Sequence, residues 1–234
     1  MKNLNWVGIW GILFVGTSIS GAIGGTDSLT DWKKIGNPDG IDVFKKDITD
    51  SPIVAFKGQG VVKAPIVRLA SILLDTSRAT EWVDRLEEIR LLRRVSDLEY
   101  ITYTHIATPL LMTHRDFVIR NRLRVDPKQN VFTLNLSSTQ DPRAPHTDYV
   151  RGEIMDSSFM LKPISETQTL VTAEIHTDPK GNVPKWAVNL FQKEWPYNTI
   201  QSLREQVQKP DITEAPQLQA YLSVLRQFVV AQNN

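Results

Sequence analysis

The stretch from Ile175 to Val207 constrains the fold more than any other part of this sequence. It begins at the end of an alternating, strand-like segment (residues 171–175) and passes through a turn at residues 178–182. From Pro184 onward, apolar residues recur at three-, four- and seven-residue steps, which predicts an amphipathic helix. The residues of this apolar stripe are Trp186, Leu190, Tyr197, Ile200, Leu203 and Val207. About 24 residues at about 1.5 Å each extend about 36 Å, so we expect this helix to lie across a whole sheet and to close an apolar cavity.

Most of the chain between residues 100 and 176 has the two-residue period of β-strands. In residues 116–125, Arg120, Arg122 and Arg124 alternate with apolar residues, so the arginines are expected to face solvent. Asn121 falls on the apolar face. Further strands, separated by turn-forming residues, are predicted at 41–45, 53–57, 60–62, 131–137, 149–155, 158–163 and 169–175. This order of elements predicts an antiparallel sheet flanked by helices, which is an α+β fold.

Two shorter helices are predicted between the early and the late strands. Pro65 suits the first position of a helix, and apolar residues step along one face through residues 66–74. A second helix is predicted from Glu81 to Arg90, with Trp82, Leu86 and Ile89 on one side and charged residues on the other.

The first 22 residues resemble a signal peptide. Lys2 is followed by an apolar or small run from Trp6 to Ile19, and small residues stand at 20–22. About fourteen apolar residues are short for a bilayer span, which needs about 20. We therefore expect residues 1–22 to be removed, residues 23–30 to form a flexible lead, and the protein to be exported, most simply to the periplasm. The alternative is an uncleaved membrane anchor.

Several classes of chemistry find little support in the sequence. The net charge of +1 gives no field that attracts nucleic acid, and the absence of cysteine excludes disulfides and thiolate chemistry. A serine-hydrolase GxSxG motif is also absent. The four histidines lack the close spacing of common metal motifs, so neither a metal nor another cofactor is expected. They are His105, His114, His146 and His176.

Two short motifs have structural interpretations. Gly58 and Gly60 lack the Lys-Ser/Thr pair of a phosphate-binding loop, so they indicate a bulge or a bend in a strand. Arg115 and Asp116 are interpreted as an ion pair at a strand edge, not as a catalytic dyad, and no catalytic residue is assigned.

Five short segments stand out in order along the chain: Ala64-Pro65, Glu81-Trp82, Arg115-Asp116-Phe117-Val118, Tyr149-Val150-Arg151-Gly152-Glu153 and the run from Asp178 to Asn189. In this order they resemble the START lipid-transfer domain, the steroidogenic-acute-regulatory-related family. The resemblance runs from about Asp31 to Gln208, and the domain is expected to span residues 31–209.

The resemblance implies a helix-grip fold, in which a curved antiparallel sheet wraps a long C-terminal helix around a lipid-sized tunnel. Sterol-binding relatives often bury an acid and an arginine there, and alignment on residues 115–117 places Thr104 and Asn121 at those positions. This neutral pair could bond a ligand hydroxyl or carbonyl but could not pair a charge. The candidate residues of the tunnel or its lid are Trp82, Tyr100, Thr104, Phe117, Ile119, Asn121, Leu123, Trp186, Leu190 and Tyr197. Trp195 is interpreted as an ordinary core residue.

Two features depart from the family pattern. Pro196 stands inside the long helix, where it removes a backbone donor and predicts a kink or a break, which is a candidate hinge. Residues 210–234 follow the domain, and a further amphipathic helix is predicted at 217–230. This helix is expected to dock on the domain, or else to contact a membrane or a second chain.

The function implied by the resemblance is the non-covalent binding and transfer of a lipid, sterol or phospholipid, without enzymatic chemistry and with transient membrane contact. One alternative is a cyclase or aromatase in the same fold, which would need a proton-handling group in the cavity. Tyr100, Tyr103 and His105 are the candidates for that group. The other alternative is a ligand sensor whose final helix binds a partner protein.

Overall fold

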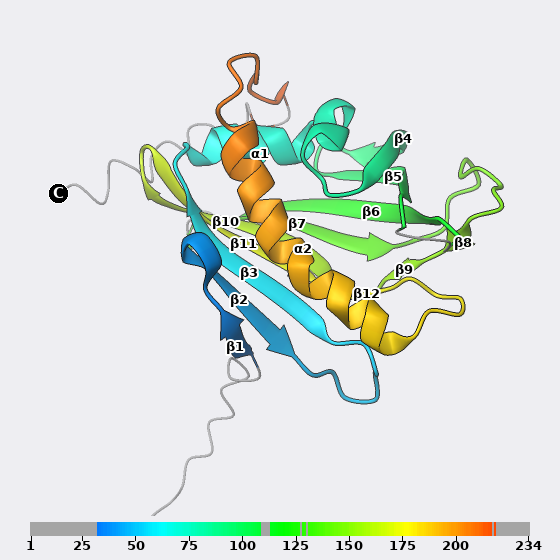
Figure 1. Ribbon diagram of the computed structural model, residues 1–234. Helices are drawn as coiled ribbons and strands as arrows, with labels where there is room; N and C mark the ends of the chain where they lie inside the picture. Colours follow the sequence, from blue (N-terminus) through cyan, green and yellow to red (C-terminus); the bar gives the residue numbers. More distant parts are fainter. Residues whose placement is uncertain (1–31, 109–112, 127, 130, 217, 219–234) are drawn as a thin grey trace, which may run out of the picture. The chain divides into compact units, whose positions relative to one another are not determined.

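A computed structural model of the chain describes residues 32–108, 113–126, 128, 129, 131–216 and 218 (Figure 1). The predicted signal peptide (1–22), the flexible lead (23–30) and, apart from Leu218, the predicted helix at 217–230 lie outside these residues. Within the described part of the chain, no helix is both long enough and apolar enough to cross a bilayer.

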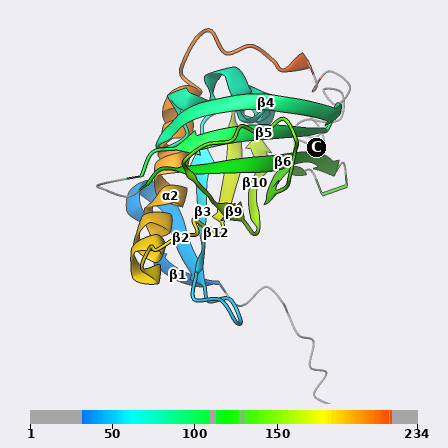
Figure 2. The same ribbon diagram turned by 90° about the vertical axis from the view of Figure 1, so that its right-hand side faces the viewer.

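A curved sheet forms the body of the protein, and its strand order is β1-β2-β3-β11-β10-β7-β6-β5-β4. Every neighbouring pair along this path is antiparallel, while β8 pairs with β6 in parallel. Strands β4 to β6 run across the direction of β3 and β10, which shows the curvature (Figure 2). The strands are β1 Lys33–Gly36, β2 Ile41–Lys46, β3 Ala55–Val62, β4 Leu86–Ser96, β5 Glu99–Ile106, β6 Arg115–Asp126, β7 Val131–Ser138, β8 Val150–Arg151, β9 Glu153–Ile154, β10 Ser157–Ser165, β11 Gln168–Ile175 and β12 Thr177–Asp178.

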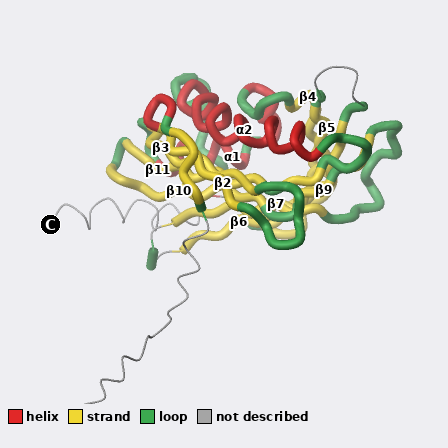
Figure 3. The backbone as a smooth tube through the Cα atoms, turned by 60° about the horizontal axis from the view of Figure 1, so that its bottom comes forward, coloured by secondary structure: helices red, strands yellow, loops and turns green. Residues whose placement is uncertain are grey.

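Both α-helices lie on one face of this sheet (Figure 3). Helix α1 (Ile66–Leu74) contacts β10, and helix α2 (Lys185–Gln206) crosses β3, β11 and β2. Two short 3-10 helices are η1 (Pro38–Gly40) and η2 (Thr76–Glu81). The predicted α+β helix-grip architecture, a curved antiparallel sheet with a long C-terminal helix, is confirmed.

The alternation predicted for β6 is confirmed in the second half of the strand, whereas residues 115–119 are buried on both faces. Phe117, Ile119, Asn121 and Leu123 are buried, whereas Arg122 and Arg124 are exposed. On the outer face, Arg120 and Arg122 both pair with Glu99 of the neighbouring β5, so a solvated ion-pair cluster accounts for the basic stripe.

The helix predicted from Glu81 to Arg90 is wrong. Glu81 ends η2, Arg85 turns the backbone with a positive φ of 59°, and β4 begins at Leu86. A register shift against β5 lies between Leu86 and Glu88. A bulge of this kind adds a residue to one strand, so Leu86 and Ile89 face the same side although they are three residues apart. The three-residue spacing of Leu86 and Ile89, which is typical of a helix, therefore arises here from a bulge in a strand.

Gly58 and Gly60 do not mark a bulge, because β3 pairs in continuous register with both β2 and β11 across them. They make room for α2. A Cβ atom at Gly58 would stand 2.7 Å from the Cβ of Pro196, and one at Gly60 would stand 3.2 Å from Ile200. Helix α2 runs through Pro196 without a break, so the predicted break does not occur, and Pro196 lies close to the sheet at Gly58.

The segment after α2 is fastened to α1 and η2. Arg68 donates to the carbonyl oxygens of Val207 and Lys209, and the backbone N–H of Ala215 donates to the Ser71 hydroxyl at 2.9 Å. Leu218 is completely buried in the main hydrophobic core. The packed part of the chain therefore continues past residue 209, where the sequence placed the end of the domain.

Candidate ligand-binding cavity

A cavity of about 300 Å³ lies between the sheet, the η2–β4 connection and the first half of α2. Its wall is mainly apolar, as in most small-molecule sites. The sheet contributes Tyr100, Thr102, Thr104, Phe117, Ile119, Asn121, Leu134, Leu136 and Phe159; the η2–β4 region contributes Ala79, Trp82, Val83, Leu86 and Ile89; and α2 contributes Val188, Phe191, Gln192 and Trp195.

The structure brings together one part of the predicted site and separates another. Trp82, Tyr100, Thr104, Phe117, Ile119 and Asn121 all line the cavity. Leu123 does not, because it belongs to the closely packed core beyond the cavity. Tyr197 does not either: its hydroxyl donates to Asp39 at 2.5 Å, on the side of α2 that faces η1.

Trp186 and Leu190 lie on α2 but point away from the cavity, with 71% and 50% of their surfaces exposed. The cavity face of the helix follows another spacing, Val188, Phe191, Gln192 and Trp195. Trp195 therefore lines the cavity, where its ring contacts that of Phe159 at a centroid distance of 5.8 Å. The predicted stripe was out of phase in this half of the helix because large exposed side chains were counted as buried. The three-, four- and seven-residue steps from Val188 to Phe191, Gln192 and Trp195 are the sequence feature that identifies the cavity face of the helix.

A small polar group interrupts the apolar wall on β5 and β6. The side-chain amide of Asn121 donates to the Thr102 hydroxyl at 3.0 Å and to the Ile119 carbonyl at 3.2 Å. Two other buried polar atoms of cavity residues, Thr104 Oγ1 and Trp82 Nε1, have no hydrogen-bond partner among the described residues. A buried polar atom without a partner costs about 1–3 kcal/mol, so a ligand atom that bonded either of them would recover part of that cost.

The proton-handling candidates lie on opposite faces of β5. Tyr100 lines the cavity, where burial raises the pKa of its phenol far above the usual range, so it stays protonated at neutral pH. Tyr103 precedes His105 by two residues, so both side chains lie on the face of β5 opposite to that of Tyr100. Burial, followed by the nearby Asp116, raises the pKa of Tyr103 to about 12. Neither Tyr103 nor His105 lines the cavity.

Three of the sequence segments that carry the family resemblance pack against one another at one end of the cavity. Asp116 does not pair with its neighbour Arg115; it accepts hydrogen bonds from Arg151 at 2.7 and 3.1 Å. Burial opposes ionisation of Asp116, but the bonds from Arg151 and Thr147 outweigh it and hold the pKa of this carboxyl below its usual value. A Cβ atom at Gly152 would meet the Phe117 ring at 2.3 Å, so this contact requires glycine.

Arg115 points to the other side of β6 and lines the cavity. Its guanidinium donates to the carbonyl oxygens of Thr113, Pro179 and Lys180, the last two at 3.3 and 3.2 Å. Burial lowers the pKa of this guanidinium. Arg115 therefore fixes the turn that leads into α2, and each of its three guanidinium nitrogens donates to a backbone carbonyl.

A family model described as the START domain matches residues 25–211, which is most of the chain. The chain belongs to the START domain family. Two solved structures have the same fold as this chain. A STAR-related lipid transfer protein fragment from Xanthomonas axonopodis superimposes with a TM-score of 0.69 at 23% identity, covering 76% of this chain and 99% of that one. Human StAR-related lipid transfer protein 5 gives a TM-score of 0.71 at 19% identity, covering 78% of this chain and 88% of that one.

Sequence relatives extend from bacteria to mammals. An uncharacterized protein of Pseudomonas aeruginosa is 26% identical over 188 residues, 80% of this chain and 92% of the relative. StAR-related lipid transfer protein 13 of Mus musculus is 24% identical over 158 residues, which cover 66% of this chain but only 14% of that much longer protein. Together with the cavity, the family membership identifies a ligand-binding fold.

Proposed function

We propose that this protein binds one lipid molecule in the cavity and carries it between membranes without changing it chemically. The observation that carries the proposal is the apolar cavity of about 300 Å³ behind the first half of α2. Burying about 500 Å² of hydrocarbon would contribute about 12 kcal/mol before the costs of ordering are subtracted. Loss of such a ligand into water is slow, so exchange needs a membrane at the mouth.

The polar atoms of the wall favour a lipid with a neutral hydrogen-bonding group, such as a hydroxyl or a carbonyl. Trp82 Nε1 can donate a hydrogen bond, and Thr104 Oγ1 can donate or accept one; both lack partners among the described residues. The deep polar residues on β5 and β6, Thr102, Thr104 and Asn121, carry no charge. Arg115 already donates to three backbone carbonyl oxygens, which leaves fewer of its five N–H groups for an anionic headgroup.

Membrane contact is proposed through the outward face of the first half of α2. Trp186 and Leu190 are one helical turn apart and are both exposed, and Lys185 precedes them. Tryptophan is enriched at the boundary between lipid headgroups and hydrocarbon, so this face suits a membrane surface. We also propose that the protein is exported to the periplasm, because residues 1–22 resemble a signal peptide.

A cavity-filling substitution tests the binding site. Leu136→Trp would place an indole in the cavity, whereas Met160→Trp would place the same ring on the exposed side of β10, because Met160 is 41% exposed. Binding is measured with a fluorescent sterol, a fluorescent fatty alcohol and a fluorescent phospholipid. We expect Leu136→Trp to abolish uptake and Met160→Trp to preserve it.

Equal uptake by the two folded variants would contradict lipid binding in this cavity. Turnover of an aromatic polyketide precursor by the wild-type protein would instead support the cyclase alternative.

A further inference from the structure

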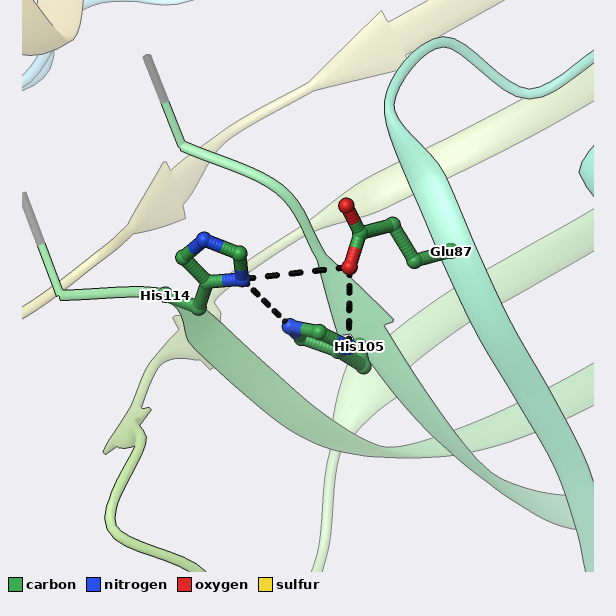
Figure 4. A group of neighbouring side chains, drawn as sticks. All are labelled: Glu87, His105 and His114. Carbon is green, nitrogen blue, oxygen red and sulfur yellow. Dashed lines mark hydrogen bonds and ion pairs between the residues drawn. The ribbon is translucent and has the colours of Figure 1, made fainter. Parts of the chain in front are cut away.

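Two histidines and a glutamate meet at the edge of β4, β5 and β6, on the side of the sheet away from the cavity. His105 Nδ1 lies 3.4 Å from Glu87 Oε2, and His114 Nδ1 lies 3.8 Å from the same oxygen (Figure 4). His105 Nε2 and His114 Nδ1 are 2.8 Å apart. Thr104 and Ile106 line the cavity, so His105 between them faces the opposite way.

The strand pairing explains why residues without a motif spacing converge here. His105 pairs with Asp116 across β5 and β6, so His114, two residues earlier, comes to the same face. Glu87 lies in the bulge between Leu86 and Glu88, where β4 passes the same end of β5. The spacing of the histidines along the chain does not predict a metal site, because the sheet brings together positions that are distant in sequence.

We propose that Glu87, His105 and His114 form a binding site for a divalent transition-metal ion of the zinc type. One ligand atom from each residue lies within 4.8 Å of the other two. Metal–ligand bonds of about 2.0–2.2 Å at tetrahedral angles place ligand atoms about 3.3–3.5 Å apart, close to the two distances from Glu87. Two imidazoles and one carboxylate suit zinc and its neighbours, and would leave further coordination positions to water or another ligand.

The hydrogen bond between the two imidazoles must open for an ion to bind. An ion held by Glu87 Oε2 and the two Nδ1 atoms would take His114 Nδ1 away from its 2.8 Å contact with His105 Nε2, which would stay uncoordinated. The rings must then separate slightly. The His114 side chain is 39% exposed and has room to move, whereas His105 is held by burial and by the Tyr149 ring, which stacks on it at 4.3 Å and 9°.

The surrounding charges favour a cation. Glu87 has no lysine or arginine partner in the part of the chain that the structure describes, and its ion-pair partners are the two histidines. The adjacent carboxylate of Asp116 is already bonded to Arg151 and Thr147 and is not needed as a ligand. A bound ion would tie together the ends of β4, β5 and β6, directly beside Arg115, which holds the turn before α2.

The test is isothermal titration of ZnCl2 into full-length protein without a polyhistidine tag, after treatment with EDTA, with MgCl2 as a second probe. We expect one zinc ion per chain with micromolar or tighter affinity and no magnesium binding. CoCl2 added in place of zinc should give the visible absorption of a low-coordinate nitrogen and oxygen site.

His114→Gln and the isosteric Glu87→Gln should each weaken zinc binding by about tenfold or more. Replacing a residue that merely hydrogen-bonds to a metal ligand already costs about tenfold in affinity. His146→Gln is the control, because His146 is exposed and outside the cluster. Absence of zinc binding by the wild-type protein, or equal binding by Glu87→Gln and wild type, would overturn the proposal. The site is on the face opposite the cavity, so this result is independent of lipid binding.

Discussion

The two halves of α2 differ in what lies beneath them. In the second half, Ile200 and Leu203 are completely buried, Pro196 touches β3 at Gly58, and Arg204 donates to the carbonyl oxygens of Val61 and Asp39. The first half, residues 185–195, has the cavity behind it and apolar side chains exposed in front. The second half is therefore called the anchor, and the first half is called the lid, since under the proposed function it covers the ligand.

Side-chain hydrogen bonds from Asn189 and Gln192 and an ion pair from Lys185 hold the lid. Asn189 Oδ1 accepts a hydrogen bond from the backbone of Val54 at 3.0 Å, and the Gln192 amide exchanges two hydrogen bonds with the backbone of Thr177. At the rim, the Arg85 guanidinium lies 5.2 Å from the centre of the Phe191 ring. Contacts of this kind can be broken locally without unpacking the anchor.

The largest expected contrast compares two leucines on this one helix. Leu203→Ala should lower the free energy of unfolding by about 2–5 kcal/mol, because it empties a fully packed position in the anchor. Leu190→Ala, in the lid, should change it by less than about 0.5 kcal/mol, because Leu190 is 50% exposed. Urea denaturation followed by circular dichroism measures both. Similar losses would show that the halves are equally packed.

A second comparison uses two glycines. Gly58→Ala should destabilise the protein by about 1–3 kcal/mol, because its new methyl group collides with Pro196. Gly36→Ala is the control, since a Cβ atom there meets its nearest neighbour, Pro38, at an ordinary 3.6 Å. If thermal unfolding showed no difference between the variants, the close crossing of α2 over β3 would be disproved.

The two lid tryptophans separate membrane contact from ligand contact. Trp186→Asp should slow lipid transfer between vesicles by about tenfold, because roughly 1.4 kcal/mol of membrane contact is lost, while equilibrium lipid uptake stays the same. Trp195→Asp, which puts a charge into the cavity, should abolish uptake. Reduced uptake by Trp186→Asp would contradict its outward position.

The smallest expected effect concerns one hydroxyl. Thr104→Val should weaken binding of a fatty alcohol by about 0.5–1.5 kcal/mol without lowering stability, because this hydroxyl lacks a protein partner. Thr199→Val is a matched control: its hydroxyl is also buried and unpartnered in the described structure, but it does not line the cavity. If Thr104→Val and the wild-type protein bound the fatty alcohol with equal affinity in fluorescence displacement assays, Thr104 would not be a ligand contact.

Hydrophobic periodicity was sufficient to predict the helices and strands that bury one regular face. The second half of strand β6 has one buried face, and the family segments at 115–118, 149–153 and 178–189 are in contact with one another, so local pattern and global packing agree. The length and position of α2 followed from the same kind of evidence.

Periodicity failed where a residue's environment depends on distant packing. A bulge gave β4 a three-residue spacing, and the small volume of Gly58 is explained only by the path of α2. The lid presents a tryptophan and a leucine to the outside because it covers a cavity, and hydrophobicity alone assigned them to the inside. His105 and His114 met through strand register, which spacing along the chain does not encode.

Native mass spectrometry of the freshly purified protein, followed by organic extraction, shows whether the space behind the lid holds a single lipid. We predict one non-covalent adduct per chain, released by solvent as an unmodified lipid with a neutral polar group, and absent from the Leu136→Trp variant. A wild-type protein without an adduct that also fails to take up lipid from vesicles, or an adduct that persists in Leu136→Trp, would contradict this prediction.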